Sequence, residues 1–340
     1  MAEMLRVLLV GGGGFIGTRV AESLLAAGHA VTVMSRGRRS GLAGCDHILA
    51  DRADAATIAG ALEGRRFDLT VDFLAYDATD VERLLTVPYA ALGRYLMISS
   101  GQVYLIAEGA EPPYREEDAE LPVIPEPEPG SYAHGNWVYG IGKRRAERAL
   151  SALRGTHGMR AVALRLPIVQ GEGDTSLRHW AYLERLLDGG PVLLPDGGTR
   201  LVRHVYAADV GRTVTWLAAH PAPRMMAYNL ASPEPVTLRE LLERMAREAG
   251  VTPRFVEVPW SEMRAAGLDD TCSPYAGRWS SLLDPSRAAA EWGFLGTRID
   301  DWLPRVTRWH LEHRPATSHP GYALRPRELE LAAGRAGALG

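Results

Sequence analysis

The chain of 340 residues is poor in cysteine and in long apolar segments. Its two cysteines, Cys45 and Cys272, are too few for a disulfide framework. No uncharged apolar stretch approaches the ~20 residues that cross a bilayer. An apolar run begins as early as Leu5, which leaves no room for a signal peptide before it. We therefore expect a cytoplasmic protein.

A charge excess of one sign is also missing. The net charge of -3 gives no overall attraction for nucleic acid or for an anionic membrane. Only one of the 38 basic residues is a lysine, Lys143. Coding bias explains an arginine excess, but arginine replaces lysine poorly where chemistry needs a compact ammonium with a shiftable pKa. Lys143 is therefore a candidate functional residue. No cluster of histidine, cysteine and carboxylate residues has metal-ligand spacing, so we expect no metal.

The first 35 residues alternate between strand-like and helical patterns. The apolar run 5–10 ends in four glycines, residues 15–27 have helical spacing, and 30–34 is again strand-like. Such an opening predicts a parallel sheet with helices on both faces. Further strand-like runs at 47–50, 69–74, 94–98 and 160–166 alternate with helix-like stretches near 55–63, 78–92 and 138–153.

A glycine array separates the first strand from the first helix. Gly11, Gly14 and Gly17 are spaced so that the turn can be tight and a diphosphate can approach the backbone. The N-terminus of the helix then offers N–H groups and a positive dipole end to the anion. The array predicts dinucleotide binding, and a purely structural turn is the alternative.

The end of the second strand bears on the identity of the dinucleotide. NAD-binding proteins usually place an acidic residue there, but residues 34–39 read MSRGRR. Ser35 stands where the acid would be, and Arg36 can pair with a 2′-phosphate. We therefore predict that the cofactor is NADP(H), and NAD is the alternative. The alternative for the arginines themselves is a solvated basic loop that binds no phosphate. Asp51, after the third strand, is either an adenine contact or an ordinary surface acid.

The remaining pattern predicts the domain organisation. Prolines and acids fill 105–136, which indicates an irregular loop, either over an active site or disordered. Residues 237–248 read as a helix with capping-box spacing between Thr237 and Glu240. We predict an α/β protein with a Rossmann-type doubly wound parallel sheet and a smaller mixed α/β C-terminal substrate domain. The ranges are 1–170 for the first domain, with returns near 203–225 and 280–298; 171–202 and 226–315 for the second; and 316–340 for a tail, partly disordered, without strong periodicity before 325–333.

Tyr139 and Lys143 lie four residues apart in a helix-like segment, and therefore on one helix face. A phenol with a pKa near 10 is a poor base at neutral pH, and a neighbouring ammonium lowers that pKa. Upstream, residues 99–104 (SSGQVY) close the fifth strand, at the end where parallel sheets bind substrates. A serine hydroxyl there can bond the substrate oxygen whose proton Tyr139 handles.

These features together resemble the extended short-chain dehydrogenase/reductase superfamily, which includes NAD-dependent epimerases and dehydratases. The resemblance covers roughly residues 5–310. It is carried by VGGGGFIG at 10–17, SSGQVY at 99–104, YGIGK at 139–143 and LRLP at 164–167. Weaker markers are VYAADV at 205–210, DPSRA at 284–288 and WGF at 292–294.

The resemblance implies a role for each matching residue. Tyr139 would be the general acid/base, Lys143 would hold the nicotinamide ribose and tune Tyr139, and Ser100 rather than Ser99 would supply the catalytic hydroxyl. Tyr104 is expected to be a packing residue. A homodimer formed through helices 78–92 and 138–153 is also implied. The implied cofactor contacts are Gly11, Gly14, Phe15, Ile16, Gly17, Ser35, Arg36, Asp51, Leu74, Ala75, Tyr139, Lys143 and Pro167.

The departures from the family pattern favour one reaction. Gly101 and Gln102 occupy the positions where sugar-nucleotide 4,6-dehydratases of the superfamily carry an acidic pair, which disfavours dehydration. Arg36 favours an exchangeable NADPH and reduction of a carbonyl on a small or sugar-like molecule. Epimerisation of a nucleotide sugar with tightly bound NAD is the alternative. Candidate substrate contacts, each with loop packing or a surface role as the alternative, are Gln102, His134, Trp137, Arg203 and Arg278.

A non-catalytic role is the remaining alternative. Residues 32–37 resemble plant chloroplast stem-loop-binding proteins, members of the superfamily known for RNA association, and an NADP sensor is a further possibility. The near-neutral charge and the complete Ser-Tyr-Lys set disfavour both, so we expect an enzyme that has a small-molecule substrate and no nucleic-acid partner.

Overall fold

The computed structural model of the chain describes residues 3–37, 42–157 and 160–338. The chain forms two compact units. Unit 1 takes in the described residues up to Val169, then Val205–Ala231 and Leu283–Gly296. Unit 2 takes in Gln170–His204, Ser232–Leu282 and the described residues from Thr297 onward.

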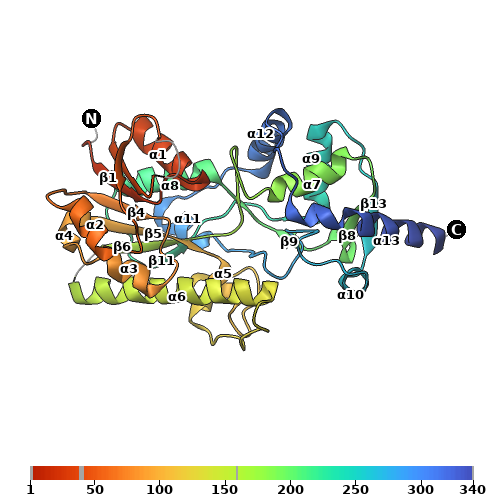
Figure 1. The fold of residues 1–340 in the computed structure, drawn as a ribbon, viewed down its shortest axis with the longest axis horizontal. Coiled ribbons are helices and arrows are strands. Elements are labelled where there is room, and N and C mark those ends of the chain that lie inside the picture. Colours follow the sequence, from red (N-terminus) through yellow and green to blue (C-terminus); the bar gives the residue numbers. More distant parts are fainter. Residues whose placement is uncertain (1–2, 38–41, 158–159, 339–340) are drawn as a thin grey trace. The chain divides into compact units, whose positions relative to one another are not determined.

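Unit 1 is built on a parallel sheet of seven strands (Figure 1). The strands are β1 (Arg6–Val10), β2 (Ala30–Ser35), β3 (Asp46–Leu49), β4 (Leu69–Asp72), β5 (Arg94–Ser100), β6 (Ala161–Leu166) and β11 (Ala227–Asn229). Their order is β11-β6-β5-β4-β1-β2-β3, and each neighbouring pair is parallel. This order runs outward from β1 in both directions, which is the doubly wound arrangement that the sequence predicts.

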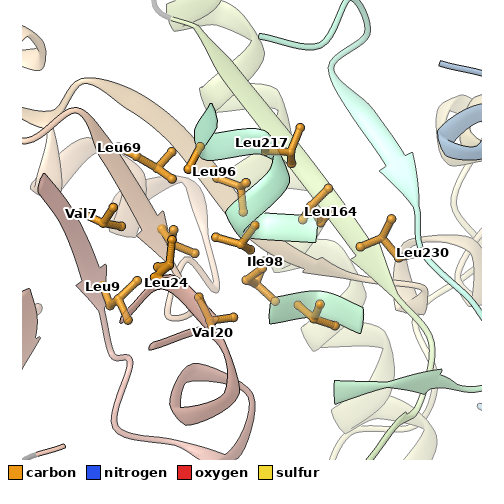
Figure 2. Close-up of a cluster of buried hydrophobic side chains, with 14 of the residues drawn as sticks. Val7, Leu9, Val20, Leu24, Leu69, Leu96, Ile98, Leu164, Leu217 and Leu230 are labelled. Carbon is orange, nitrogen blue, oxygen red and sulfur yellow. The ribbon is translucent and has the colours of Figure 1, made fainter. Parts of the chain in front are cut away.

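Helices cover both faces of this sheet. Side chains alternate along β1: Val7 and Leu9 enter a cluster with side chains of α1 and α8 (Figure 2), and Leu8 and Val10 enter one with α2, α3 and α6. Because both faces of the central strands are buried, β1 and β5 contain continuous apolar runs at 7–10 and 95–98, whereas three of the four residues of the edge strand β3 are exposed. The other elements of unit 1 are α1 (Phe15–Ala26), α2 (Ala55–Leu62), α3 (Ala78–Leu84), α4 (Tyr89–Leu92), α5 (Gln102–Leu105), the 3₁₀ helix η1 (Glu116–Glu120), α6 (Tyr132–His157), α8 (Ala207–Ala219), α11 (Ser286–Trp292) and the short β7 (Val169–Gln170) and β10 (Val205–Tyr206).

Two segments of unit 1 differ from the prediction. The helix expected over 78–92 is two helices, α3 and α4, because Pro88 interrupts the backbone hydrogen bonding and caps the second one. The proline-rich segment 105–136 is ordered. The Glu116 carboxylate accepts the backbone N–H of Asn229 in β11 at 2.8 Å, so this segment is anchored to the sheet. Strand β11 itself belongs to unit 1, although its sequence falls in the predicted range 226–315 of the substrate domain.

Unit 2 is a smaller mixed α/β unit. Parallel strands β8 and β13 form one pair and antiparallel β9 and β12 another. The predicted capping box between Thr237 and Glu240 is present at the start of α9, which confirms this helix. The elements are α7 (Arg178–Leu187), β8 (Val192–Pro195), η2 (Asp196–Gly198), β9 (Leu201–Val202), β12 (Val236–Thr237), α9 (Leu238–Ala249), β13 (Phe255–Val258), α10 (Trp260–Ala265), α12 (Ile299–Glu312), η3 (Pro320–Leu324) and α13 (Arg325–Ala338).

The segment predicted as a tail, 316–340, contributes η3 and α13 to unit 2. Arg185 on α7 donates to both carboxylate oxygens of Glu328 on α13, at 2.6–3.1 Å, and each side chain is only 2% exposed. A buried ion pair adds nothing to an apolar pattern, so the periodicity at 325–333 did not by itself predict that α13 packs into unit 2. Among the described residues, no helix combines the length and the apolar character that a membrane span requires.

We expect Glu328→Ala to lower the free energy of unfolding by about 3–5 kcal/mol, because it leaves the Arg185 guanidinium buried without its carboxylate. Urea unfolding of the purified protein measures this loss. Glu330→Ala is the matched control, because Glu330 is exposed on the same helix. A loss no larger than that of the control would contradict the role of the pair.

Candidate active site

The turn between β1 and α1 has one crowded side and one open side. A Cβ at Gly17 would lie 2.3 Å from the carbonyl oxygen of Gly12, so the helix packs directly on the turn. A Cβ at Gly13 or Gly14 would meet nothing within 4 Å. No side chain caps α1, so the first-turn N–H groups, beginning with Phe15 and Ile16, are left for an anion at the open side. This turn fits the diphosphate of a dinucleotide.

The end of β2 carries a cation and no carboxylate within the described residues 35–37. Ser35 accepts the N–H of Gly37 at 3.3 Å, and Arg36 is exposed directly after the strand. Arg38 and Arg39, which continue the basic run, lie outside the described residues. The carboxylate of Asp51 accepts the N–H of Ala53 at 2.9 Å, so Asp51 stabilises the turn after β3.

Lys143 is almost completely buried, with 1% of its surface exposed. Its Nζ donates to the carbonyl oxygen of Ala75 at 2.9 Å and to that of Ile98 at 3.0 Å. These acceptors follow β4 and lie in β5, so α6, β4 and β5 all meet at the ammonium. Burial is the main cause that lowers the pKa of Lys143, to about 8.

Tyr139 lies one helical turn before Lys143 and is 36% exposed. Its ring centre is 5.7 Å from Lys143 Nζ, so the structure brings these two side chains together. Ser100 ends β5, and its hydroxyl accepts the N–H of Gln102 at 3.2 Å. The Gln102 carbonyl oxygen in turn lies 3.0 Å from where a Cβ of Gly140 would stand, so this turn contacts α6 beside Tyr139.

The two serines that end β5 have different surroundings. The Ser99 hydroxyl is buried and donates to Glu147 of α6, which also binds Arg165. Tyr104 joins the same network, since its hydroxyl donates to Asn229 at 2.6 Å and accepts from Arg165 at 2.8 Å. Ser99 and Tyr104 are therefore structural, and Ser100 stays the predicted reactive serine.

Sequence reasoning missed Tyr76. Its ring centre lies 4.8 Å from Lys143 Nζ and 6.2 Å from the ring centre of Tyr139, and 51% of its surface is exposed. Partial burial and the nearby Asp72 carboxylate raise the pKa of Tyr76, so its phenol is neutral at pH 7. The available signal was its place directly after Leu74 and Ala75, the implied cofactor contacts.

The substrate candidates separate into two groups. Gln102 is buried, and its amide nitrogen has no hydrogen-bond partner among the described residues, so it remains a candidate donor to a ligand. His134 Nε2 lies 3.0 Å from the Glu126 carboxylate, and Trp137 donates to the carbonyl of Ile124 at 3.1 Å. His134 and Trp137 thus fasten the start of α6 to the proline-rich segment.

Arg203 and Arg278 belong to unit 2. Arg203 donates to the carbonyl of Pro233 at 3.3 Å, and the Arg278 guanidinium lies over the ring of Trp279 at 4.9 Å. Both therefore have structural contacts inside that unit. Over the described part of the chain, no group of three or more histidine, cysteine and acidic residues could hold a metal ion.

Comparison with known proteins identifies the family. The sequence profile of the NAD dependent epimerase/dehydratase family matches residues 7–231. The chain belongs to this family. It is therefore an enzyme of the NAD-dependent short-chain dehydrogenase/reductase type.

Three known proteins are similar to this chain in sequence or in fold. A 2′-dehydrokanamycin reductase from Streptomyces kanamyceticus is 28% identical over 289 residues, which cover 83% of this chain and 77% of that protein. The chloroplast stem-loop binding protein of 41 kDa b from Arabidopsis thaliana is 22% identical over 261 residues, which cover 72% of this chain and 63% of that protein. The UDP-glucose 4-epimerase of Thermotoga maritima shares the fold alone, with a TM-score of 0.71 at 18% identity over 92% of this chain and 100% of that one.

Proposed function

We propose that this enzyme uses NADPH to reduce a carbonyl on a small or sugar-like molecule. The observation that carries the proposal is Arg36, an exposed guanidinium directly after β2 where an NAD-binding protein usually has a carboxylate. A guanidinium binds a phosphate through two parallel hydrogen bonds, whereas it offers no such match to ribose hydroxyls. The similarity to a reductase supports the reductive direction.

The residues around Lys143 can handle the proton of such a reduction. When bound, a reduced nicotinamide supplies a hydride to the carbonyl carbon. The Tyr139 hydroxyl donates its proton to the carbonyl oxygen, and the adjacent Lys143 ammonium stabilises the phenolate that remains. Because its pKa is about 8, Lys143 keeps most of its charge at pH 7. Ser100 donates a hydrogen bond that holds the substrate oxygen beside Tyr139.

The other implied contacts complete the proposal for the cofactor. The turn from Gly11 through Gly14 to Gly17 would hold the diphosphate, and Asp51 would lie near the adenine. Leu74, Ala75 and Pro167 would border the nicotinamide, because they follow the carboxyl ends of strands β4 and β6. The buried Gln102 amide would donate to the substrate. A homodimer through α3 and α6 also stays part of the proposal.

Arg36→Asp is expected to change the preference for NADPH over NADH by about 100-fold in kcat/KM, because a charge-assisted hydrogen-bond pair is replaced by charge repulsion. Binding is followed by energy transfer from the eight tryptophans to reduced nucleotide, and turnover by NADPH loss with cyclic ketones and oxidised aminosugars. Arg66→Asp, the same charge change at an exposed site before β4, is the control.

An unchanged preference in Arg36→Asp would remove the basis for NADPH. Denaturing the purified protein supplies a second criterion, because it releases any nucleotide that is retained. An empty site supports an exchangeable cofactor and net reduction. Retained NAD⁺ would replace the proposal with epimerisation, in which the cofactor is recycled without leaving the site.

A further inference from the structure

The short segment after β4 is held at both ends by carboxylates. Asp72 is fully buried, and its Oδ1 accepts the N–H of Leu74 at 2.8 Å. Asp80, in the first turn of α3, accepts the N–H of Tyr76 at 2.9 Å. Ala75 lies between these two bonded residues. The position of the Ala75 peptide is thus fixed by two acidic side chains from different elements.

One arginine connects the two carboxylates. Arg52, which follows β3, donates to Asp72 Oδ1 at 2.8 Å, and a second nitrogen lies 2.7 Å from Asp72 Oδ2. The same guanidinium donates to the backbone carbonyl of Asp80 at 2.9 Å and lies 3.7 Å from its carboxylate. Tyr95 of β5 donates its hydroxyl to Asp72. Only the planar fork of an arginine offers this many donors in one plane.

The segment that Arg52 organises contacts the catalytic helix through its backbone. The Ala75 carbonyl accepts Lys143 Nζ at 2.9 Å. The neighbouring carbonyl of Tyr76 lies 2.2 Å from where a Cβ of Gly142 would stand, so α6 packs against the segment without an intervening side chain. A displacement of the segment would therefore move one of the two oxygen atoms that hold Lys143.

We propose that Arg52 is a positioning residue for Lys143, acting through Asp72 and Asp80 on the carbonyl of Ala75. The proposal rests on the proposed function only in that Lys143 is taken as the partner of the proton donor. It assigns Arg52 a role in the chemistry rather than in binding adenine, although it directly follows Asp51.

The charges around Lys143 support this assignment. Burial lowers the pKa of Lys143, the carboxylates of Asp72, Glu147 and Asp80 raise it, and Arg52 lowers it. Two phenol rings also face the ammonium, that of Tyr76 at 4.8 Å and that of Tyr139 at 5.7 Å from Nζ. We call Arg52 together with Asp72 and Asp80 the Arg52 clamp. Its charges affect the pKa of Lys143, and its hydrogen bonds fix the carbonyl that accepts from Lys143.

Lys143 offers an unusually direct test because it is the only lysine in the chain. Lysine labelled with ¹³C at Cε and supplied during expression gives a single NMR resonance, whose shift against pH reports the pKa of Lys143 without assignment. We expect Arg52→Gln to move that pKa from about 8 toward the ~10.4 of a solvated lysine and to lower kcat at least about 10-fold. The control is Arg145→Gln, which removes an exposed arginine 3.5 Å from Asp77 and leaves the clamp intact.

Asp72→Asn separates positioning from a direct charge effect. It removes the carboxylate charge that favours the Lys143 ammonium, and with it the ion pair that holds Arg52. The charge effect alone would lower the pKa of Lys143, whereas displacement of the Ala75 carbonyl raises it toward the solvated value. We expect a rise, and this variant decides the matter alone if Arg52→Gln does not fold.

Two results would overturn the proposal. One is a folded Arg52→Gln protein whose Lys143 pKa and kcat equal those of the wild type. The other is an Asp72→Asn protein in which the pKa of Lys143 falls or stays constant. The NMR measurement needs no turnover, so its outcome is independent of the NADPH assay. Expected Lys143 shifts in an enzyme without any NADPH-dependent reduction would refute the proposed function and support the role of Arg52.

Discussion

Tyr139→Phe is expected to lower kcat by about 10³-fold while the affinity for NADPH stays within about twofold. The ring that lies 5.7 Å from Lys143 Nζ is retained, and only the hydroxyl that donates the proton is lost. Carbonyl-dependent NADPH loss measures the first quantity, and tryptophan energy transfer measures the second. Tyr132→Phe, at an exposed position in the first turn of α6, is the matched control for loss of a phenol hydroxyl.

A smaller decrease in kcat would indicate that Tyr76 can donate the proton. Tyr76 presents a second neutral phenol at 4.8 Å from the same ammonium, closer than Tyr139. If Tyr139→Phe kept more than about a tenth of the wild-type kcat, the assignment of Tyr139 as proton donor would be wrong. Adding Tyr76→Phe to that variant would then show whether Tyr76 supplies the proton.

The parts of this site that were predictable from sequence are local. Gly17 is fixed by the contact between one turn and the next helix, and Tyr139 and Lys143 share a face because of helical periodicity. The apolar strands could be recognised because burial on both faces leaves runs without alternation. In each case the residues that determine the structure lie within a few positions of one another, so one sequence is enough to show the pattern.

The parts that were not predictable depend on pairs far apart in the chain. The Arg52 clamp joins positions 20 and 28 residues away, and Glu328 meets Arg185 across 143 residues. A charged residue reads as a surface residue until its partner is known, because burial of a charge is stable only when it is paired. The same reasoning explains the ordered proline-rich segment, whose Glu116 is bonded to a strand 113 residues later.

Unit 2 is expected to lose stability steeply in mild acid, because it contains three buried histidines. His179, His204 and His310 are each at most 3% exposed. His179 Nε2 lies 3.1 Å from the Thr307 hydroxyl and its ring stacks on His310, while His204 Nε2 and both ring nitrogens of His310 have no partner among the described residues. Among the described residues, only Asp174 near His310 favours an added proton on any of these rings, so charging them inside the fold is unfavourable.

Burial lowers the pKa of all three groups, that of His204 to about 3. Arg178 also opposes protonation of His204, and His310 opposes protonation of His179. At His310 the carboxylate of Asp174 favours protonation. In the unfolded chain each histidine takes up a proton near pH 6.5. Below that pH the unfolded state binds more protons than the folded state. The stability due to neutral histidines is therefore complete above about pH 6.5 and is lost as the pH falls.

The expected loss is about 1.4 kcal/mol per pH unit for each fully buried histidine, or about 4 kcal/mol for His179 and His204 together between about pH 6.5 and pH 5. Urea unfolding at a series of pH values measures it. His204→Gln removes one of these groups and should lower the slope of the unfolding free energy against pH by about 1.4 kcal/mol per pH unit. The control His47→Gln, at an exposed position, should leave that slope unchanged. An equal slope in His204→Gln and the wild type would mean that His204 is already protonated, or accessible to water, in the folded enzyme. The acid sensitivity would then come from His179 and His310 and, below about pH 5, from the carboxylates that pair with arginines.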